Sequence, residues 1–252
     1  QGWLFTLDKP SWIPFLQYSK RRDLREKLYR GYITRGDHGD DLDNKKIIAR
    51  IAALRVQQAK LLGFSTFADY VLDEQMAKTP KAVFELLDRL WKAALPIARK
   101  EAAELQKLAD REKPRVKLAS WDWWHYAEQL RKKLYDLDEE QLRPYFQLDN
   151  VIAGIFAVAG KLYGLKFEER KDLPKYNPEV RTYEVKEADG RLLGILLMDF
   201  HPRPGKRTGA WMGEYRQQMK KDGRHVHPIV TIVCNFTRPT GDAPALLSFE
   251  EV

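Results

Sequence analysis

The chain has 252 residues and a formal net charge of +8, and its composition of 32% charged and 44% hydrophobic residues excludes a disordered tail or a fibre. Its single cysteine, Cys234, excludes an internal disulfide framework and any Cys-x-x-Cys zinc or redox site. The longest apolar run, residues 151–159, is far shorter than the ~20 residues that a membrane-spanning helix requires.

Residues 1–163 carry helical patterns throughout. Apolar residues recur at three- and four-residue steps in 19–30 and again in 47–61, and we expect the second of these stripes to be buried. Gly63 is suited to end that helix, and Ser65 is placed to cap the next one. The first part of the chain is therefore predicted to be a body of several helices.

The dipeptide Thr79-Pro80 marks the start of the longest predicted helix. Threonine is a good N-cap, and proline fits the first helical position because its missing N–H has no partner there. Apolar residues from Phe84 to Leu108 then follow a three-four spacing, which predicts a helix of about thirty residues.

Two further segments of this region are unusually apolar. Residues 121–126 contain three tryptophans and a tyrosine, which could stack on single-stranded nucleic acid, but we favour packing between helices. Residues 149–163 are apolar nearly all round and rich in Ala and Gly, which predicts a central helix in close contact with its neighbours.

Beyond Gly164 the pattern changes to that of strands. Residues 182–186 alternate, and 192–198 are almost wholly apolar, as expected for a strand buried on both faces. Asp189-Gly190 between them predicts a type I′ hairpin turn. Residues 228–236 form another apolar, β-branched strand. Residues 164–252 are thus predicted to form a small sheet attached to the helical body of residues 1–163.

Most of the positive charge lies in residues 201–240, where eight basic residues stand against two acidic ones. Such a concentration indicates an anionic partner at one place rather than a charge spread over the whole surface. A solvated basic loop is the alternative interpretation.

The last residues carry the signature of a helix start. Ser248 and Glu251 form a capping box, and Leu247 and Val252 occupy the positions of a hydrophobic staple. We therefore expect a helix to begin here and the sequence to be part of a longer protein.

The sequence contains no convincing catalytic centre. There is no Gly-x-Ser-x-Gly and no glycine-rich phosphate-binding motif, and Cys234 lies among apolar residues, where a buried, inert thiol is expected. His225 and His227 are two residues apart and could share one face of a strand as zinc ligands, but we favour structural or solvent-facing roles.

Several short motifs together resemble the zinc oligopeptidases related to thimet oligopeptidase and neurolysin, most closely their bacterial dipeptidyl carboxypeptidase branch. The resemblance covers essentially the whole chain. Its pieces include Met76-Ala77-Lys78-Thr79-Pro80, Asp122-Trp123-Trp124, Gly205-Lys206-Arg207, Gly209-Ala210-Trp211-Met212 and Val233-Cys234-Asn235-Phe236-Thr237.

The resemblance implies a larger helical clamshell peptidase that releases dipeptides from the C-termini of oligopeptides. In that family the helix that is capped at Ser248 carries the His-Glu-x-x-His zinc motif, so the zinc ligands and general base would lie beyond Val252. We therefore expect zinc in the parent enzyme, no metal and no catalytic residue in this chain, and no activity of the chain alone.

The same resemblance suggests which residues hold the substrate. An edge strand can bind an extended peptide through its backbone, and we assign this role to Gly209, Ala210, Trp211, Met212 and Gly213, with an ordinary sheet edge as the alternative. The basic charge of residues 201–240 suits an enzyme that must hold a free C-terminal carboxylate, although no particular arginine is singled out.

The expected partners are oligopeptide substrates and the remainder of the peptidase chain, without nucleic acid or membrane. The resemblance implies a cytoplasmic protein, or a periplasmic one if a signal precedes Gln1. A different hypothesis is a stand-alone basic module that binds nucleic acid or acidic peptides through residues 201–240 and the tryptophan cluster.

Overall fold

A computed structural model describes residues 2–136, 139–241 and 243–252. It divides into two compact units, one formed by Gln1–Pro14 with Lys132–Val252 and the other by Phe15–Arg131. The chain is mainly α-helical with a small sheet near its C-terminus, as expected. The change from helix to strand falls after Tyr163, but the compact units divide elsewhere, so the division at 163 and 164 stays a prediction.

The Phe15–Arg131 unit is built from helices, and no helix in the described part of the chain is long and apolar enough to cross a membrane. Its elements are the end of α1 (Lys9–Tyr18), α2 (Arg22–Ile33), α3 (Lys45–Leu61), α4 (Phe67–Leu72), α5 (Pro80–Ala109), the short 3-10 turn Ser120–Asp122 and most of α6 (Trp123–Tyr135).

The helix boundaries follow local capping chemistry. The Thr79 hydroxyl accepts the N–H of Ala82, and Pro80 is the first residue of α5, as predicted. The prediction for α4 was wrong by one residue, because Thr66 and not Ser65 is its N-cap. Thr66 has the extended backbone of a cap and exchanges two hydrogen bonds with Asp69, three residues further on.

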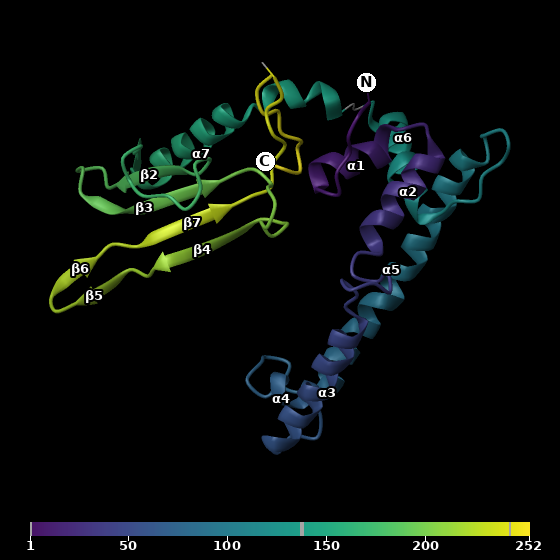
Figure 1. Cartoon of the computed structure of the whole chain (residues 1–252), viewed down its shortest axis with the longest axis horizontal. Helices are drawn as coiled ribbons and strands as arrows, with labels where there is room; N and C mark the ends of the chain where they lie inside the picture. Colours follow the sequence, from purple (N-terminus) through teal and green to yellow (C-terminus); the bar gives the residue numbers. More distant parts are fainter. Residues whose placement is uncertain (1, 137–138, 242) are drawn as a thin grey trace. The chain divides into compact units, whose positions relative to one another are not determined.

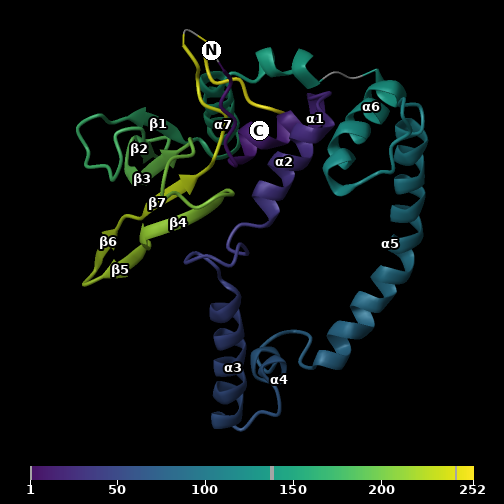
Figure 2. The ribbon, with the colours of Figure 1, turned by 45° about the vertical axis from the view of Figure 1, so that its right-hand side comes forward.

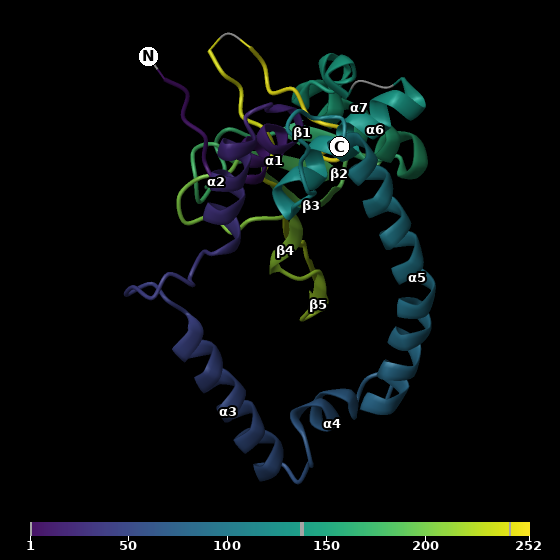
Figure 3. The same cartoon turned by 90° about the vertical axis from the view of Figure 1, so that its right-hand side faces the viewer.

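The apolar stripe of α3 is not buried, which corrects the sequence-based expectation, and the stripe of α5 is exposed over its first part. Leu61 is 87% exposed and Trp91 is 64% exposed. A stripe of this kind is buried only when a second layer packs on it. Figure 3 shows α3 and α5 well apart, joined through α4, so the described residues of this unit supply no such layer.

The core of this unit lies at the end of α5. Leu105, Leu108 and Ala109 pack there against Tyr126 of α6. Of the aromatic residues at 121–126, Tyr126 thus packs between helices, whereas Trp123 is partly exposed. Beside this core the buried carboxylate of Asp122 forms ion pairs with Arg22 and Arg25, at 2.8 and 2.9 Å.

The other unit holds the sheet, whose five strands lie in the order β1-β2-β3-β7-β4 (Figure 1). The pair β3 and β7 is parallel and the other pairs are antiparallel. The elements are α7 (Leu148–Tyr163), β1 (Lys166–Glu169), β2 (Arg181–Lys186), β3 (Leu192–Asp199), β4 (Trp211–Arg216), β5 (Met219–Lys221), β6 (Arg224–Val226) and β7 (Ile229–Val233).

Helix α7 covers one face of this sheet (Figure 2). Leu148 and Ile152 of α7 pack in one buried cluster with Tyr183 of β2 and Met198 of β3. Contrary to the prediction of a helix enclosed by neighbours, the far face of α7 is open, and Leu162 is 67% exposed. Only the stripe that faces the sheet is covered.

The type I′ turn occurs at a different place from the predicted one. Such a turn requires positive φ at both central residues. Between β2 and β3 only Gly190 has a positive φ, so Asp189-Gly190 does not form one. Asp222 and Gly223, with φ of 50° and 77°, meet the requirement and join β5 to β6. The signal, an Asp-Gly pair between two extended segments, was present in the sequence.

Candidate functional site

Strand β4 forms one edge of the sheet. It pairs with β7, in a register that places Trp211 opposite Val233 and Gly213 opposite Thr231. Its other side has no neighbouring strand in the described part of the chain. An edge of this kind presents unpaired backbone N–H and C=O groups.

The backbone hydrogen bonds between β7 and β3 identify which residues of β4 point outward. The Cys234 N–H donates to the Asp199 carbonyl, and the Pro228 carbonyl accepts the N–H of Ile195, so the even-numbered residues face β3. Thr231 and Val233 therefore face β4, because successive residues of a strand turn their backbone groups to opposite sides.

Consequently Trp211 and Gly213 direct their backbone groups to β7, and Met212 and Glu214 direct theirs to the free edge. The five residues predicted to hold substrate thus have different places. Trp211, Met212 and Gly213 lie in the edge strand, while Gly209 and Ala210 precede it. Glu214, which the sequence-based prediction did not include, is the second residue of β4 whose backbone N–H and C=O groups point to the free edge.

The loop that leads into β4 is held by a side chain of the segment after β7. The Asn235 amide donates to the carbonyls of Arg207 and Gly209, at 3.0 and 2.6 Å. Gly209 has a φ of +99°, which side-chain-bearing residues rarely adopt. At Gly213 an added Cβ would lie 3.3 Å from the Thr231 methyl, so glycine allows close approach of the two strands.

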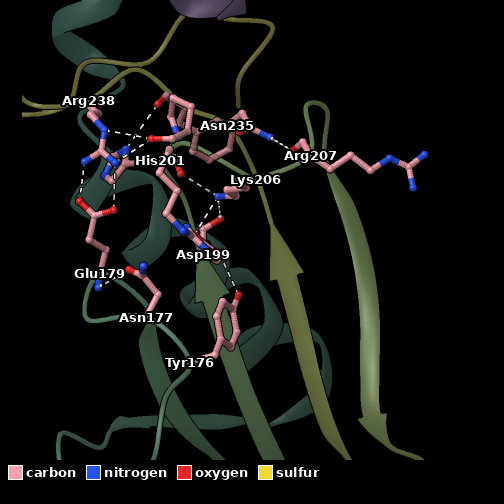
Figure 4. Close-up of polar contacts among 12 residues, drawn as sticks. Tyr176, Asn177, Glu179, Asp199, His201, Lys206, Arg207, Asn235 and Arg238 are labelled. Carbon is pink, nitrogen blue, oxygen red and sulfur yellow. Dashed lines mark hydrogen bonds and ion pairs between the residues drawn. The ribbon is translucent and has the colours of Figure 1, made fainter. Parts of the chain in front are cut away.

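A buried carboxylate, Asp199 at the end of β3, organises the basic residues of this loop (Figure 4). Both terminal guanidinium nitrogens of Arg203 donate to it, at 2.7 and 2.8 Å. The Lys206 ammonium donates to Oδ1 at 2.8 Å and to the His201 carbonyl at 2.8 Å. The Tyr176 hydroxyl donates to Oδ2 at 2.8 Å. These bonds tie residues 203–206 to the sheet.

Burial by itself would raise the pKa of Asp199, but the hydrogen bonds from Arg203, Lys206 and Tyr176 outweigh it and lower the pKa to about 2. Burial lowers the pKa of Lys206, and the neighbouring carboxylate opposes that change. Burial raises the pKa of Tyr176 to about 12, so its hydroxyl stays protonated and donates to Asp199. The cluster is a stable ionic support and not a proton-transfer site.

The other cations near the start of β4 differ in whether they have a carboxylate partner. Arg238 donates to Glu179 through both terminal nitrogens. Arg207 has no carboxylate partner among the described residues; its guanidinium lies 5.9 Å from the centre of the Trp211 ring. Figure 4 shows its side chain directed away from the Asp199 cluster. Arg207 is therefore available for an anion.

A cavity of about 390 Å³ lies on the sheet face opposite α7. Tyr176, Leu197, Tyr215 and Ile229 contribute to its mainly apolar lining. Thr182 also lines it, and its buried hydroxyl has no hydrogen-bond partner among the described residues. The cavity is suited to an apolar side chain, and one of its walls, Tyr215, belongs to the edge strand.

No three His, Cys, Asp or Glu side chains in the described residues are grouped as a metal site. His225 and His227 do not form a metal site. The Nδ1 atom of His227 lies 3.3 Å from the carbonyl oxygen of Leu193, and His225 is exposed on β6. Burial raises the pKa of Cys234 to about 11, so its thiol is a poor nucleophile at neutral pH.

Comparison with known proteins gives the family. Residues 15–252 match Peptidase family M3. The chain is 39% identical to oligopeptidase A of Escherichia coli over 257 residues, which are 100% of this chain and 38% of that protein. It is 39% identical to dipeptidyl carboxypeptidase of the same organism over 251 residues, 99% of this chain and 37% of that protein.

An organellar oligopeptidase A of Arabidopsis thaliana is 40% identical over 258 residues, 99% of this chain and 32% of that protein. The chain thus spans about a third of the length of these curated relatives. These matches cover the edge strand, the Asp199 cluster and the helices alike. The chain belongs to Peptidase family M3.

Proposed function

We propose that this chain forms the substrate-holding part of a zinc metallopeptidase that releases dipeptides from the C-termini of oligopeptides. The observation that carries the proposal is the free edge of β4, where the backbone groups of Met212 and Glu214 point outward. An extended peptide that pairs with them extends the sheet by one strand.

Pairing through the backbone suits an enzyme that accepts many sequences. The hydrogen bonds use N–H and C=O groups that every peptide carries, so they impose little selection on side chains. Selectivity among peptides then depends on the groups beside the edge. These are Arg207 near the start of β4 and the apolar cavity bounded by Tyr215.

We propose that Arg207 holds the C-terminal carboxylate of the peptide. A guanidinium binds a carboxylate through two parallel hydrogen bonds, and Arg207 is not engaged by a carboxylate of the described residues. Arg207→Gln should weaken binding of a peptide with a free C-terminus and leave binding of its C-terminal amide unchanged. Equal losses for both peptides would rule out this role.

The residues of this chain do not fit a zinc site. The sequence contains no His-Glu-x-x-His, and the described residues contain no group of three metal ligands. We propose that the zinc ligands and general base belong to the remainder of the peptidase and that this chain alone does not hydrolyse peptides. Stoichiometric zinc by atomic absorption, or chelator-sensitive cleavage by this chain, would contradict that.

A backbone substitution tests the proposed edge. Met212→Pro removes one outward N–H without removing a bond to β7, and proline is tolerated on such an edge. Met212→Ala is the matched control, because it shortens the same side chain and keeps the N–H. We expect Met212→Pro to weaken binding of a blocked oligopeptide by roughly 2- to 10-fold relative to Met212→Ala, in fluorescence anisotropy. Equal affinities would refute the proposal.

The parent enzyme is proposed to lie in the cytoplasm, or in the periplasm if a signal segment precedes this sequence. Fractionation of cells that express the intact protein tests this, and recovery in the membrane fraction would contradict it.

A further inference from the structure

The hairpin formed by β5 and β6 carries a cluster of cations that the proposed function leaves without a role. Lys220, Lys221 and Arg224 are all exposed on its two short strands. They form no ion pair with any described residue, unlike Arg203, Lys206 and Arg238 of the same stretch. With Asp222 at the turn, the tip from Met219 to His225 has a formal charge of +2.

The register of the hairpin places two of these cations, Lys221 and Arg224, on the same face, and Lys220 on the other. Lys221 is paired directly with Arg224, and Lys220 with His225. Like charges in directly opposite positions of two strands are destabilising. The type I′ turn at Asp222 and Gly223 fixes this register. An anion bound on the face of the hairpin that carries Lys221 and Arg224 would relieve the repulsion.

The tip lies along the same edge as the proposed peptide site. Strand β5 follows β4 after Gln217 and Gln218, and among the described strands β5 pairs with β6 alone. Figures 1 and 3 show the hairpin projecting from the sheet beyond β4. Glu214, the acidic residue of β4, accepts a hydrogen bond from Gln217. A peptide paired with β4 that continues in the direction of the hairpin therefore passes beside Lys220 and Lys221.

We infer that the β5–β6 hairpin selects oligopeptides with acidic side chains, which it binds through Lys220, Lys221 and Arg224. This inference rests on the proposed binding of peptides to β4. Gly213 and Lys220 are seven positions apart, about 23 Å of extended chain at ~3.3 Å per residue. With the C-terminus at Arg207 the peptide runs antiparallel to β4, so the selected acidic residues lie toward its N-terminus.

The test compares two peptides of about 12 residues, long enough for the edge from Trp211 to Lys221. They share one C-terminal sequence and differ only in three N-terminal residues, which are Glu in one and Gln in the other. Binding to the 252-residue chain is measured by fluorescence anisotropy at low and high salt. The hairpin variant carries Lys220→Gln, Lys221→Gln and Arg224→Gln.

The control variant carries Lys92→Gln, Arg99→Gln and Lys100→Gln, which remove the same charge from exposed positions of α5. We expect the wild-type chain to bind the Glu peptide roughly tenfold more tightly than the Gln peptide at low salt. That advantage should disappear in the hairpin variant and at high salt, and persist in the control variant.

Equal binding of both peptides to the wild-type chain would overturn the inference and leave peptide binding at β4 intact. Equal loss in the control variant, or tighter binding of a single-stranded DNA of matched charge than of the Glu peptide, would also overturn it. If neither peptide binds, the proposed function fails and the inference fails with it.

Discussion

The basic residues of the loop before β4 and those of the β5–β6 hairpin are of the same types and lie within twenty-two positions of one another, from Arg203 to Arg224. Arg203 and Lys206 converge on one buried carboxylate, whereas Lys220, Lys221 and Arg224 are exposed and without a carboxylate partner among the described residues. The first set holds the fold together, and the second set is available to a ligand. The difference arises from one residue, because the buried carboxylate of Asp199 is the counter-charge of the first set.

The largest expected effect is a difference in how much the two sets of basic residues contribute to the stability of the fold. Asp199→Ala leaves Lys206 and Arg203 largely buried without their counter-charge, so we expect a loss of about 3–5 kcal/mol in the free energy of unfolding. The hairpin variant with Lys220, Lys221 and Arg224 changed to Gln should stay within about 0.5 kcal/mol of the wild-type chain. Urea denaturation measures both. A larger loss for the hairpin variant would reverse the assignment of the two sets.

A second difference concerns the response to acid. The pKa of Asp199 is about 2 in the folded chain, below its ordinary value of 3.8, so its ionic bonds stabilise the fold above about pH 4. That stabilisation is lost as the pH falls from about 4 to about 2, because over this range the unfolded chain takes up a proton at Asp199 that the folded chain does not. The stability difference between wild type and Asp199→Asn should therefore shrink over this range. A difference that stays constant would show that Asp199 is not ionised in the fold.

The smallest expected effect concerns the hairpin alone. Lys221→Glu places opposite charges across from one another at the pair with Arg224, and we expect it to stabilise the fold by about 0.2–1 kcal/mol. The same change should weaken binding of the Glu peptide. A gain in stability with a loss of binding indicates that the native cations serve a ligand. Unchanged binding would indicate an ordinary solvated hairpin.

Local patterns in the sequence predicted most of the elements. The Thr79-Pro80 start of α5, the end of α3 before Gly63 and the strands β2, β3 and β7 depend on neighbouring residues, and the structure confirms them, with β7 shorter than the predicted 228–236. The burial of the α3 stripe was predicted wrongly, because burial depends on a second layer that periodicity cannot reveal. The Asp189-Gly190 turn was wrong because the dipeptide permits a type I′ turn without requiring one.

The candidate site was predictable only in part. The motif that contains Trp211 and Met212 indicated the strand, but which residues point outward depends on the register with β7, which only the fold supplies. The Asp199 cluster was missed because Tyr176 and Lys206 lie thirty positions apart and meet only when β3 and its loops are in place. A lone Asp at the end of an apolar strand was the available signal.

Hydrogen–deuterium exchange of the amides of β4, with and without bound peptide, tests most directly whether the free edge binds substrate. In the free chain the Met212 and Glu214 amides face outward and should exchange fast, while the Gly213 amide, bonded to β7, should exchange slowly. A bound oligopeptide is predicted to slow exchange at Met212 and Glu214. Unchanged exchange at both amides with peptide bound would contradict binding along this strand.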